Sequence, residues 1–347
     1  MKRIAIFQTD LGLGGIQTAL LTLMIYLENK SYHIDLYLFE KAEKELTLPR
    51  NISVKYMKPF PVAFKLLPFS LVKHFARGKV SSASYDVSID FNGYSVDTAL
   101  GALQISAEHK VIWVHSDYEK RIKYNLKFRM LWGQMKRKYS FFDEVAVVSK
   151  GAEKAFRKVI DYGVSTRVVS NIIDIAYIMR MKDEATTLSV DPDRYNLVTM
   201  GRLVHSKGFD LLLDLFATIW EKRQDMMLYI IGDGPEMKSL LAKRDELGLK
   251  ECVTFLESQM NPYTMMDQMD GFVFAPRYEG QGIVLLEAFA LGLDVFVPKE
   301  MEAFNPAVIG IENMEEALLG AEKKEKAYIS LEKYNSSVIK EIDRLLS

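Results

Sequence analysis

Two glutamates, Glu279 and Glu287, are the residues of this sequence whose type and spacing most clearly suggest chemistry. They stand eight positions apart across a Gly-x-Gly turn, after an apolar run at residues 271–276 that indicates a buried strand. Glu287 lies in a strongly apolar helical segment, where a carboxylate is costly unless it has a partner. The free N–H groups that open such a helix can hold an anion, and a carboxylate further along can reach hydroxyls of the same ligand. A phosphate beside a polyol is the chemistry of a sugar nucleotide.

A second candidate group lies at residues 201–208, immediately after another predicted strand. Arg202 and Lys207 flank a turn that precedes a helix. Two cations held at such a turn can bind a diphosphate, because arginine offers a planar fork of donors and lysine a compact charge. Taken by itself, the turn fits two solvated surface cations equally well. Diphosphate binding is therefore a hypothesis that depends on the rest of the pattern.

Two further strand ends carry weaker signals. Gly14 and Gly15, in the turn between the first strand and the first helix, let the backbone come close to a ligand, although their spacing is not G-x-G-x-x-G. His115 closes a strand and could donate a hydrogen bond to a sugar hydroxyl. In isolation, an ordinary satisfied histidine is the better interpretation of His115.

Two segments that contain aspartate have structural explanations. Asp233 is expected to cap a helix that begins at Pro235, with a secondary role for this turn in lining a nucleotide pocket. Asp191-Pro192-Asp193 has the pattern of a metal-binding D-x-D, but it lies in a polar loop before the second run of strands. We interpret it as turn chemistry and predict no metal site there.

These loops need elements that position them, and the hydrophobic pattern supplies two runs of alternating strands and helices. Such alternation indicates an α/β protein with two parallel sheets, each covered on both faces. Ligands of such sheets bind at the carboxyl ends of the strands, and two facing domains create a cleft. The predicted strands are residues 3–8, 33–40, 52–57, 86–91, 111–115, 144–149 and 167–170, then 196–200, 227–232, 252–256, 271–275, 294–298 and 308–311.

The length of 347 residues exceeds that of one ordinary core, so two domains are expected. We place the N-terminal domain at residues 1–173 and the C-terminal domain at residues 174–328. Residues 329–347 include a stretch with helical periodicity and are expected to form a C-terminal helix. The helices predicted in the second half are residues 209–222, 235–247, 263–268, 283–291 and 314–323.

The net charge of −1 conceals a difference between the halves. Basic residues exceed acidic ones by 9 in residues 1–175, and acidic residues exceed basic ones by 10 in the remainder. The basic excess lies in residues 55–79 and 120–138, where aromatic and aliphatic residues are interleaved. Helices of this composition can lie on anionic lipid headgroups, which we favour slightly over two amphipathic helices with solvated cations. No nucleic-acid-binding motif accompanies the charge, so no nucleic acid partner is expected.

Composition limits the remaining classes. A hydrophobic content of 49% excludes wholesale disorder, and the single Cys252 cannot form an internal disulfide, which fits a reducing compartment. The N-terminus lacks the pattern of a signal peptide, and no uncharged run approaches the ~20 residues that span a bilayer. We therefore expect a cytoplasmic protein that is peripheral at the inner face of the cell membrane.

Together the motifs resemble those of the retaining glycosyltransferases of the GT-B fold, specifically family 4, also called group 1. The resemblance covers nearly the whole chain and includes the E-x7-E signature of that family, Glu279-x7-Glu287. It implies two Rossmann-like, doubly wound domains that face a cleft, an acceptor-side N-terminal domain, a C-terminal domain that binds the nucleotide sugar, and a tail helix that crosses back to the first domain. The other matching segments are Gly14-Gly15-Ile16, His115, Asn171, Gly201-Arg202-x4-Lys207-Gly208 and Gly232-Asp233-Gly234-Pro235.

The resemblance also implies a role for each matching position. Arg202 and Lys207 would bind the donor diphosphate and stabilise the leaving nucleotide in place of a divalent metal, so no cofactor is expected. Glu287 would accept hydrogen bonds from the ribose hydroxyls, Glu279 would hold the donor sugar, and His115 would reach that sugar from the other domain. The remaining donor-binding positions are Gly14, Gly15, Asn171, Gly232, Gly234, Leu256, Gly280, Gln281, Gly282 and Ile283.

The implied reaction is glycosyl transfer with retention at the anomeric carbon, from a UDP-sugar to a hydroxyl of a lipid-linked or polymeric acceptor in cell-surface polysaccharide synthesis. Two close carboxylates also suggest a hydrolase, but here they share one turn and helix with the phosphate-binding N–H groups, which favours binding roles. The alternatives are a sugar-nucleotide epimerase-like enzyme and a catalytically silent partner subunit. Glu257 stands where the family usually has glycine, near the expected wall for the base, so the base is the least determined feature.

Overall fold

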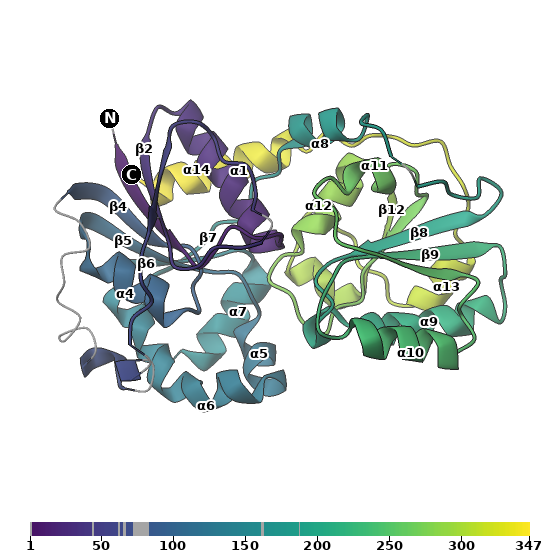
Figure 1. Cartoon of the computed structure of the whole chain (residues 1–347), viewed down its shortest axis with the longest axis horizontal. Coiled ribbons are helices and arrows are strands. Elements are labelled where there is room, and N and C mark those ends of the chain that lie inside the picture. Colours follow the sequence, from purple (N-terminus) through teal and green to yellow (C-terminus); the bar gives the residue numbers. More distant parts are fainter. Residues whose placement is uncertain are drawn as a thin grey trace. The chain divides into compact units, whose positions relative to one another are not determined.

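The structure is a computed structural model that describes residues 2–43, 45–61, 63–64, 67–71, 83–160, 163–186 and 188–347. The chain divides into two compact units, labelled by element in Figure 1: unit 1 consists of Met1–Ile172 with Ser336–Ser347, and unit 2 of Ile173–Asn335. Each unit is built on one parallel β-sheet with helices packed against it. The predicted α/β class with two doubly wound parallel sheets is confirmed.

The sheet of unit 1 has seven strands among the described residues, all paired in parallel. Its central strands are apolar runs buried on both faces, as expected for a sheet covered by helices. From one edge to the other, the strands are β3 (Ile52–Tyr56), β2 (His33–Leu38), β1 (Arg3–Gln8), β4 (Ser84–Asp90), β5 (Ser106–Val114), β6 (Glu144–Val147) and β7 (Thr166–Val168).

Helices connect these strands, and side chains start several of them. Ser95, Asp117, Asn125 and Ser149 each accept a hydrogen bond from a backbone N–H group of the helix that follows, which satisfies a donor that the helix itself leaves unpaired. The helices of unit 1 are α1 (Gly15–Asn29), α4 (Val96–Gln104), α5 (Tyr118–Tyr124), α6 (Leu126–Met135), the 3₁₀ helix η1 (Lys136–Phe141) and α7 (Lys150–Val159).

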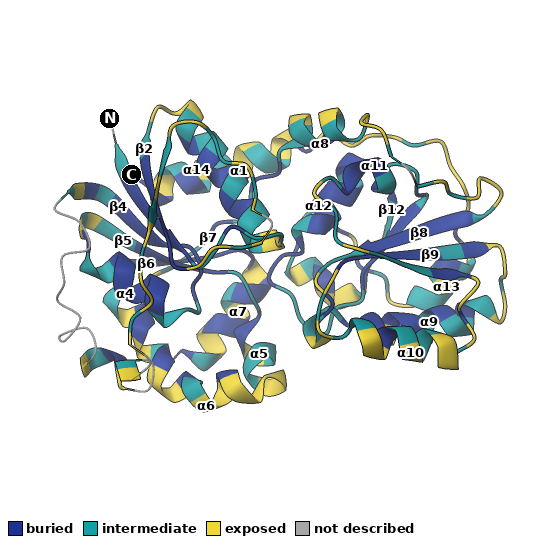
Figure 2. Ribbon diagram, viewed as in Figure 1, coloured by how far each residue is buried: buried dark blue, intermediate teal, exposed yellow. Residues whose placement is uncertain are grey.

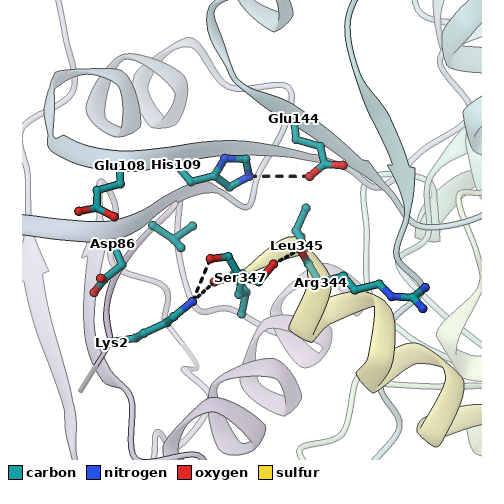
Figure 3. Close-up of a pocket in the computed structure, with 10 residues that line it drawn as sticks. Lys2, Asp86, Glu108, His109, Glu144, Arg344, Leu345 and Ser347 are labelled. Carbon is teal, nitrogen blue, oxygen red and sulfur yellow. Dashed lines mark hydrogen bonds and ion pairs between the residues drawn. The ribbon is translucent and has the colours of Figure 1, made fainter.

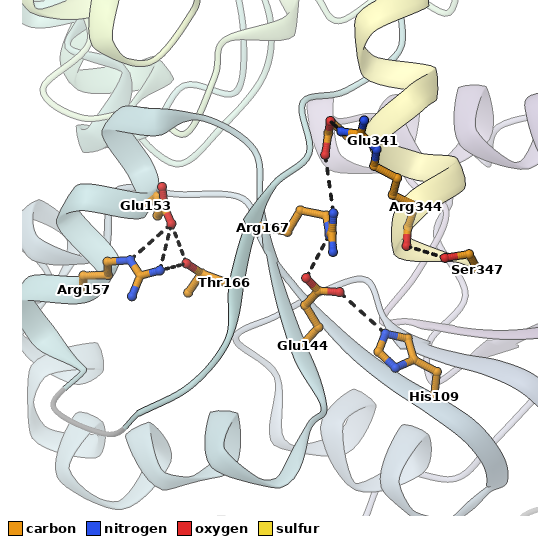
Figure 4. Close-up of polar contacts among 9 residues, drawn as sticks. All are labelled: His109, Glu144, Glu153, Arg157, Thr166, Arg167, Glu341, Arg344 and Ser347. Carbon is orange, nitrogen blue, oxygen red and sulfur yellow. Dashed lines mark hydrogen bonds and ion pairs between the residues drawn. The ribbon is translucent and has the colours of Figure 1, made fainter.

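The last helix, α14 (Glu332–Leu345), contributes its residues from Ser336 onward to unit 1. Tyr26 of α1 donates a 2.6 Å hydrogen bond to Asp343. Arg167 of β7 forms ion pairs with Glu144 of β6 at 2.8 Å and with Glu341 of α14 at 3.6 Å (Figure 4). These contacts fix the end of the chain on the sheet of unit 1.

The same chain end borders a hollow of about 300 Å³ in unit 1 (Figure 3). Lys2, Asp86, His109 and Glu144, which line it, stand at or near the starts of β1, β4, β5 and β6. Lys2 donates hydrogen bonds across it to the backbone carbonyls of Leu346 and Ser347. Ligands of open parallel sheets bind at the carboxyl ends of the strands, so this hollow lies at the opposite edge.

Unit 2 has a five-stranded parallel sheet in its described part. The strands, in spatial order, are β10 (Val253–Leu256), β9 (Met226–Ile231), β8 (Tyr195–Met200), β11 (Gly271–Val273) and β12 (Asp294–Phe296). Its helices are α8 (Ile175–Met181), η2 (His205–Lys207), α9 (Phe209–Trp220), α10 (Met237–Glu246), α11 (Tyr263–Met266), α12 (Ile283–Ala290), η3 (Lys299–Ala303) and α13 (Met314–Leu319).

Alternate residues of the unit 2 strands enter two separate cores. Leu228 and Ile230 of β9 pack with side chains of α9, α10 and α13, whereas Tyr229 and Ile231 pack with those of α8, α11 and α12. Figure 1 shows these two sets of helices on opposite faces of the sheet, and Figure 2 shows the strands between them as buried. The period of two in a strand therefore explains why its apolar run is continuous.

The order of the strands brings two loops together. The chain runs from β8 to β9 and β10 on one side, then returns to pair β11 with the other side of β8. The carboxyl ends of β8 and β11 are therefore neighbours at the point where the strand order reverses, which is the usual ligand-binding position of such a sheet. The loops at 201–208 and 274–282 follow these two strand ends.

Two expectations about local structure were wrong. Residues 308–311 do not form the predicted strand: Ile311 makes a single bridge to Pro298, and Gly310 donates its N–H group to Glu302 instead of to a neighbouring strand. Asp233 does not cap a helix, because α10 begins at Met237, and the Asp233 carboxylate accepts hydrogen bonds from the backbone N–H group of Ser258, at 3.0 Å, and from its hydroxyl.

The first basic segment, residues 55–79, is only partly visible. Residues 55 and 56 end β3, while residues 62, 65–66 and 72–79 lie outside the described residues. The predicted amphipathic helix there is therefore not assessed. The second basic segment, residues 120–138, is described in full and forms parts of α5, α6 and η1.

Candidate active site

The loops after β8 and β11 are tied to each other by a bidentate ion pair. The Nη1 and Nη2 atoms of Arg277 lie 2.5 and 2.6 Å from the two carboxylate oxygens of Asp210, at the start of α9. The backbone N–H group of Arg277 donates to the carbonyl of Ser206 at 2.9 Å, and Nη1 also donates to the carbonyl of His205 at 3.2 Å. A planar guanidinium with this many bonds holds the two loops in one register.

Lys207 and Glu279, predicted from two separate motifs, form an ion pair in the structure. The Lys207 ammonium donates to Oε2 of Glu279, and both side chains are partly buried, with 24% and 16% of their surfaces exposed. Oε1 of Glu279 accepts the N–H group of Gly280 at 3.0 Å. An ammonium has three donors, so this pair fixes the cation while leaving it able to meet further acceptors.

Arg202 lies on the same loop but is exposed. Within the described ranges its guanidinium makes no hydrogen bond or ion pair, and its carbonyl accepts the N–H group of Val204 at 2.8 Å. The side chain therefore costs little to reorganise around an anion. Its availability contrasts with that of Arg277, whose fork is occupied by Asp210.

Gly208 explains how the loop after β8 approaches the loop after β11 so closely. Its φ is +68°, in the left-handed region, and a Cβ atom at this position would lie 2.3 Å from the carbonyl oxygen of Ala275. Only glycine avoids both the strained backbone and this clash. The Gly208 position therefore sets where Lys207 stands relative to the Glu279 turn.

The turn before α12 is held by hydrogen bonds from a buried asparagine. The Nδ2 group of Asn305, which is fully buried, donates to the carbonyls of Gln281 at 3.2 Å and Gly282 at 3.4 Å. Gly282 occupies the N-cap position with φ of +70°, and no side chain caps the helix there. The first N–H groups of α12, from Ile283 onward, consequently form the positive end of a helix dipole without a capping carboxylate, which suits a phosphate.

Glu287 lies inside α12 and is 4% exposed. The hydroxyl of Tyr263 donates to its Oε1 at 3.2 Å. Burial raises the pKa of Glu287 to about 7, and the Tyr263 hydrogen bond opposes that shift. Near neutral pH the site thus holds a carboxyl group poised between its two protonation states, in an apolar surrounding where hydrogen bonds to it are strong.

The glycines after β9 have a packing explanation. A Cβ atom on Gly232 would lie 2.0 Å from the carbonyl oxygen of Gly201, and one on Gly234 would lie 2.3 Å from that of Leu203. Both therefore let the loops after β8 and β9 touch through their backbones. Leu256, at the end of β10, is half-buried and accepts the N–H group of Gly232 at 2.9 Å. A direct donor contact for these three residues stays a prediction.

The other predicted site residues belong to unit 1. His115 follows β5, with its ring 4.5 Å from that of Phe91 and its Nε2 atom buried without a hydrogen-bond partner in the described part of the chain. Burial lowers its pKa to about 3, so the imidazole is neutral at any physiological pH. Gly14 is the exposed N-cap of α1, Gly15 is its first residue, and Asn171 follows β7.

Asp210, Arg277, Asn305 and Tyr263 are the site residues that sequence reasoning missed. An acidic residue in the first turn of a helix and an arginine two positions before Glu279 were visible signals. Pairing them requires knowing that β8 and β11 are neighbours, which only the strand order shows. Tyr263 and Asn305 lie in segments without any recognisable motif.

Neither a metal centre nor a membrane span emerges from the described residues. No group of three or more His, Cys, Asp or Glu side chains in those ranges is arranged to hold a metal ion, and none of their helices is long and apolar enough to cross a bilayer. Asp191 accepts the N–H group of Asp193 at 3.0 Å, which is the hydrogen bond of an aspartate turn.

The sequence of this chain is similar to those of several known proteins. The family model described as glycosyl transferases group 1 matches residues 182–311. An uncharacterised glycosyltransferase of Methanocaldococcus jannaschii is 26% identical over 53% of this chain and 47% of its own length. The lipopolysaccharide core biosynthesis glycosyltransferase LpsD of Rhizobium meliloti is 34% identical over 30% and 29%, and the alpha-monoglucosyldiacylglycerol synthase of Streptococcus pneumoniae is 23% identical over 81% and 67%. The chain thus spans less than half of the first two relatives.

Solved structures share the fold across the whole chain. The chain superposes on S. aureus TarM, solved with Fondaparinux, alpha-GlcNAc-glycerol and UDP, with a TM-score of 0.73, 11% identity and full coverage of both chains. Anabaena HepE in complex with UDP-glucose gives a TM-score of 0.63 at 17% identity, covering 99% of this chain and 90% of that one. At these identities the likeness establishes the fold alone.

Proposed function

We propose that this chain, which belongs to the group 1 glycosyltransferases and has the GT-B fold, transfers a sugar from a nucleotide-sugar donor to a hydroxyl group of a glycan or lipid-linked acceptor. The observation that carries this proposal is the Lys207–Glu279 pair beside the uncapped start of α12, with buried Glu287 one turn further on. A cation, free N–H groups and a buried hydroxyl acceptor are the three parts that a nucleotide diphosphate sugar requires.

In this proposal each group has one task. Arg202 and Lys207 bind the diphosphate and stabilise the charge that develops when the bond from the anomeric carbon to the phosphate oxygen breaks. Glu287 accepts hydrogen bonds from the ribose hydroxyls, while Glu279 and the N–H groups of residues 280–283 hold the sugar and the phosphate. The acceptor hydroxyl attacks from the side that the nucleotide leaves and gives its proton to the departing phosphate oxygen, so the configuration at the anomeric carbon is retained.

UDP is the nucleotide that we propose for the donor, because TarM and HepE, which share the fold, were solved with UDP or UDP-glucose. The acceptor class follows from relatives named for lipopolysaccharide core, O-antigen and glycolipid synthesis. We therefore propose a role in cell-surface polysaccharide or glycolipid synthesis at the inner face of the membrane. His115, Asn171 and the Gly14-Gly15 turn of unit 1 are proposed to complete the donor and acceptor contacts.

Thermal unfolding with UDP, GDP and ADP, followed by a panel of sugar nucleotides carrying the preferred base, tests this proposal. A ligand at a hundred times its dissociation constant adds about 2.7 kcal/mol of stability, which gives a clear shift. Stabilisation by one base, with donor consumption only when an acceptor is present, supports the transferase. Turnover of the donor without an acceptor would favour an epimerase, and no stabilisation by any nucleotide would favour a silent partner subunit.

A further inference from the structure

Five exposed apolar side chains of unit 1 lie in two short segments, residues 67–71 and 124–130. They are exposed to 40%, 50%, 44%, 60% and 74% for Leu67, Leu71, Tyr124, Leu126 and Met130. Buried Phe69 of the first segment packs against Phe141, at the end of the 3₁₀ helix η1 that follows α6 along the chain, with their rings 5.8 Å apart. We call the exposed face of these two segments the α6 surface.

The geometry of α6 explains why this surface is apolar without being part of the core. Phe128 and Trp132, four residues apart, are buried and pack edge-on against the ring of Tyr118. Leu126 and Met130 are also four residues apart but lie about 200° away around the helix, so they point outward. Figure 2 shows the outer side of α6 as exposed.

The charged residues of the chain segment that contains α6 have one sign. Between Glu119 and Asp143 the chain has eight basic residues and no acidic one. Lys123, Lys127 and Arg129 are exposed, and they make no ion pair with the described residues. Two of the other cations are used internally: the Arg121 guanidinium lies 4.3 Å from the ring centre of Tyr94, and Lys138 is buried.

The α6 surface is also fixed relative to the carboxyl edge of the unit 1 sheet. In η1, Lys138 donates to the carbonyl of Ser95 at 3.1 Å, and Tyr139 donates to that of Gly93 at 2.7 Å. Both carbonyls belong to the loop that follows β4, next to Phe91, which packs on His115. The element that follows α6 is therefore tied by hydrogen bonds to the loop at the carboxyl end of β4.

We propose that the α6 surface docks on a bilayer of anionic lipids, with Leu126 and Met130 entering the headgroup region and Lys123, Lys127 and Arg129 meeting the lipid phosphates. Exposed apolar side chains flanked along the helix by exposed cations match an interface that is negatively charged above an apolar interior. A protein partner or a second copy of this chain would instead need acidic groups facing these cations. The inference is independent of which donor the site of unit 2 takes.

The test is flotation of the full chain with vesicles of phosphatidylcholine alone or mixed with phosphatidylglycerol. We expect binding to the mixed vesicles that weakens with salt, and little binding to phosphatidylcholine alone. Each cation near such a surface contributes about a fivefold increase in binding, so Lys123→Glu/Lys127→Glu/Arg129→Glu should reduce it by at least about a hundredfold. Lys238→Glu/Lys250→Glu/Lys333→Glu is the matched control, because it reverses three exposed lysines of unit 2.

The apolar contribution is tested with Leu126→Ser/Met130→Ser against Leu211→Ser/Met260→Ser, the same two residue types at exposed positions of unit 2. The first pair should reduce vesicle binding at least tenfold with unchanged thermal unfolding, and the second pair should leave it as in the natural chain. Equal binding by both pairs, binding to neutral vesicles alone, or no binding to either vesicle would overturn the proposal. So would a self-association that Leu126→Ser/Met130→Ser abolishes. Stabilisation by UDP, measured in parallel, reports separately on the proposed donor site.

Discussion

At the scale of single residues, Glu287 has the most informative environment. Within the described ranges its carboxyl group has one hydroxyl partner and no ion pair, and burial raises its pKa to about 7. In the proposed function, a carboxyl group buried at such a cost is explained by an incoming pair of hydroxyl donors. The sequence alone predicted the residue and its buried helix. It could not predict the pKa, because the only described hydrogen-bond partner, Tyr263, comes from a different helix.

This environment predicts a pH dependence. In the absence of ligand, the folded protein takes up a proton that the unfolded chain lacks between pH 4.5 and 7, so the contribution of Glu287 to stability is present below that range and lost as the pH rises through 7. If Glu287 has the proposed ribose-binding role, binding has the opposite dependence, since hydroxyl donors need the ionised carboxylate. Affinity for a nucleotide sugar, whose diphosphate does not titrate here, should fall about tenfold from pH 8 to pH 6.

Calorimetric titration at the two pH values measures this effect. Glu287→Gln should bind weakly at both and lose the dependence, and Glu287→Ala should lose a few kcal/mol of binding free energy, as expected for a hydrogen-bonded charged group. Tyr263→Phe removes the hydrogen bond that opposes the shift, so the midpoint should move to higher pH. An unchanged affinity in Glu287→Ala would remove the ribose role.

The two cations of the loop after β8 predict activity without a metal. Arg202 is exposed and unpaired within the described ranges, and Lys207 is fixed by Glu279, so both can approach a leaving diphosphate. Arg202→Ala should reduce kcat/KM by about 10²–10³, the usual effect of removing one transition-state donor, while EDTA should leave turnover of the natural enzyme largely intact. Loss of activity in EDTA that added metal restores would contradict this assignment.

At the scale of elements, the Asp210–Arg277 pair predicts that activity depends on how the loops after β8 and β11 are held against each other. Asp210→Asn breaks the bidentate contact and should lower kcat/KM by about tenfold or more, because Lys207 and Glu279 lie on the two loops that it joins. Asp214→Asn is the matched control, since Asp214 also lies in α9 and this substitution removes its partly exposed ion pair with Lys243 of α10. Asp214→Asn should change neither kcat/KM nor the unfolding temperature. Equal effects of the two substitutions would show that the pair acts only through the stability of α9.

The same scale shows what sequence patterns can and cannot supply. The buried strands and their order along the chain were predictable, because parallel strands are continuous apolar runs separated by amphipathic helices. The segment at 308–311 has the same apolar character but contains Gly310, and its backbone is satisfied by Glu302 and by one bridge to Pro298. Which strands are neighbours, and therefore which loops meet, depends on packing between distant segments that periodicity does not record.

At the scale of the whole molecule, part of the charge difference between the halves lies on the α6 surface, where Lys123, Lys127 and Arg129 are exposed. The structure separates internal cations such as Lys138, whose pKa burial lowers to about 8, from exposed ones such as Lys127. Composition predicted that a basic region exists. Which cations face solvent depends on the direction of α6, fixed by Phe128 and Trp132 in the core.

The division of the chain into units predicts how it unfolds. Unit 2 is one continuous segment, whereas unit 1 also includes residues 336–347, which comprise most of α14 and the chain end after it. Val338, Ile342, Leu345 and Leu346 of this segment are buried. Burying each such side chain contributes about 1.5–3 kcal/mol, so their removal costs an amount similar to the whole stability of a domain. Deleting residues 336–347 should therefore abolish the unfolding transition of unit 1 in calorimetry. The transition of unit 2 should persist and still shift upward with UDP.

Single substitutions in α14 separate the loss of contacts between this helix and unit 1 from a general loss of folding. Ile342→Ala should destabilise unit 1 by about 2–5 kcal/mol through a cavity, and Lys340→Ala, on the exposed side of the same helix, should change nothing. The contacts of Asp343 with Tyr26 and of Glu341 with Arg167 predict that the transition of unit 1 is the one affected, since both partners lie in unit 1. If both transitions moved together, the two units would unfold as one cooperative body, and the donor site could not be studied in unit 2 alone.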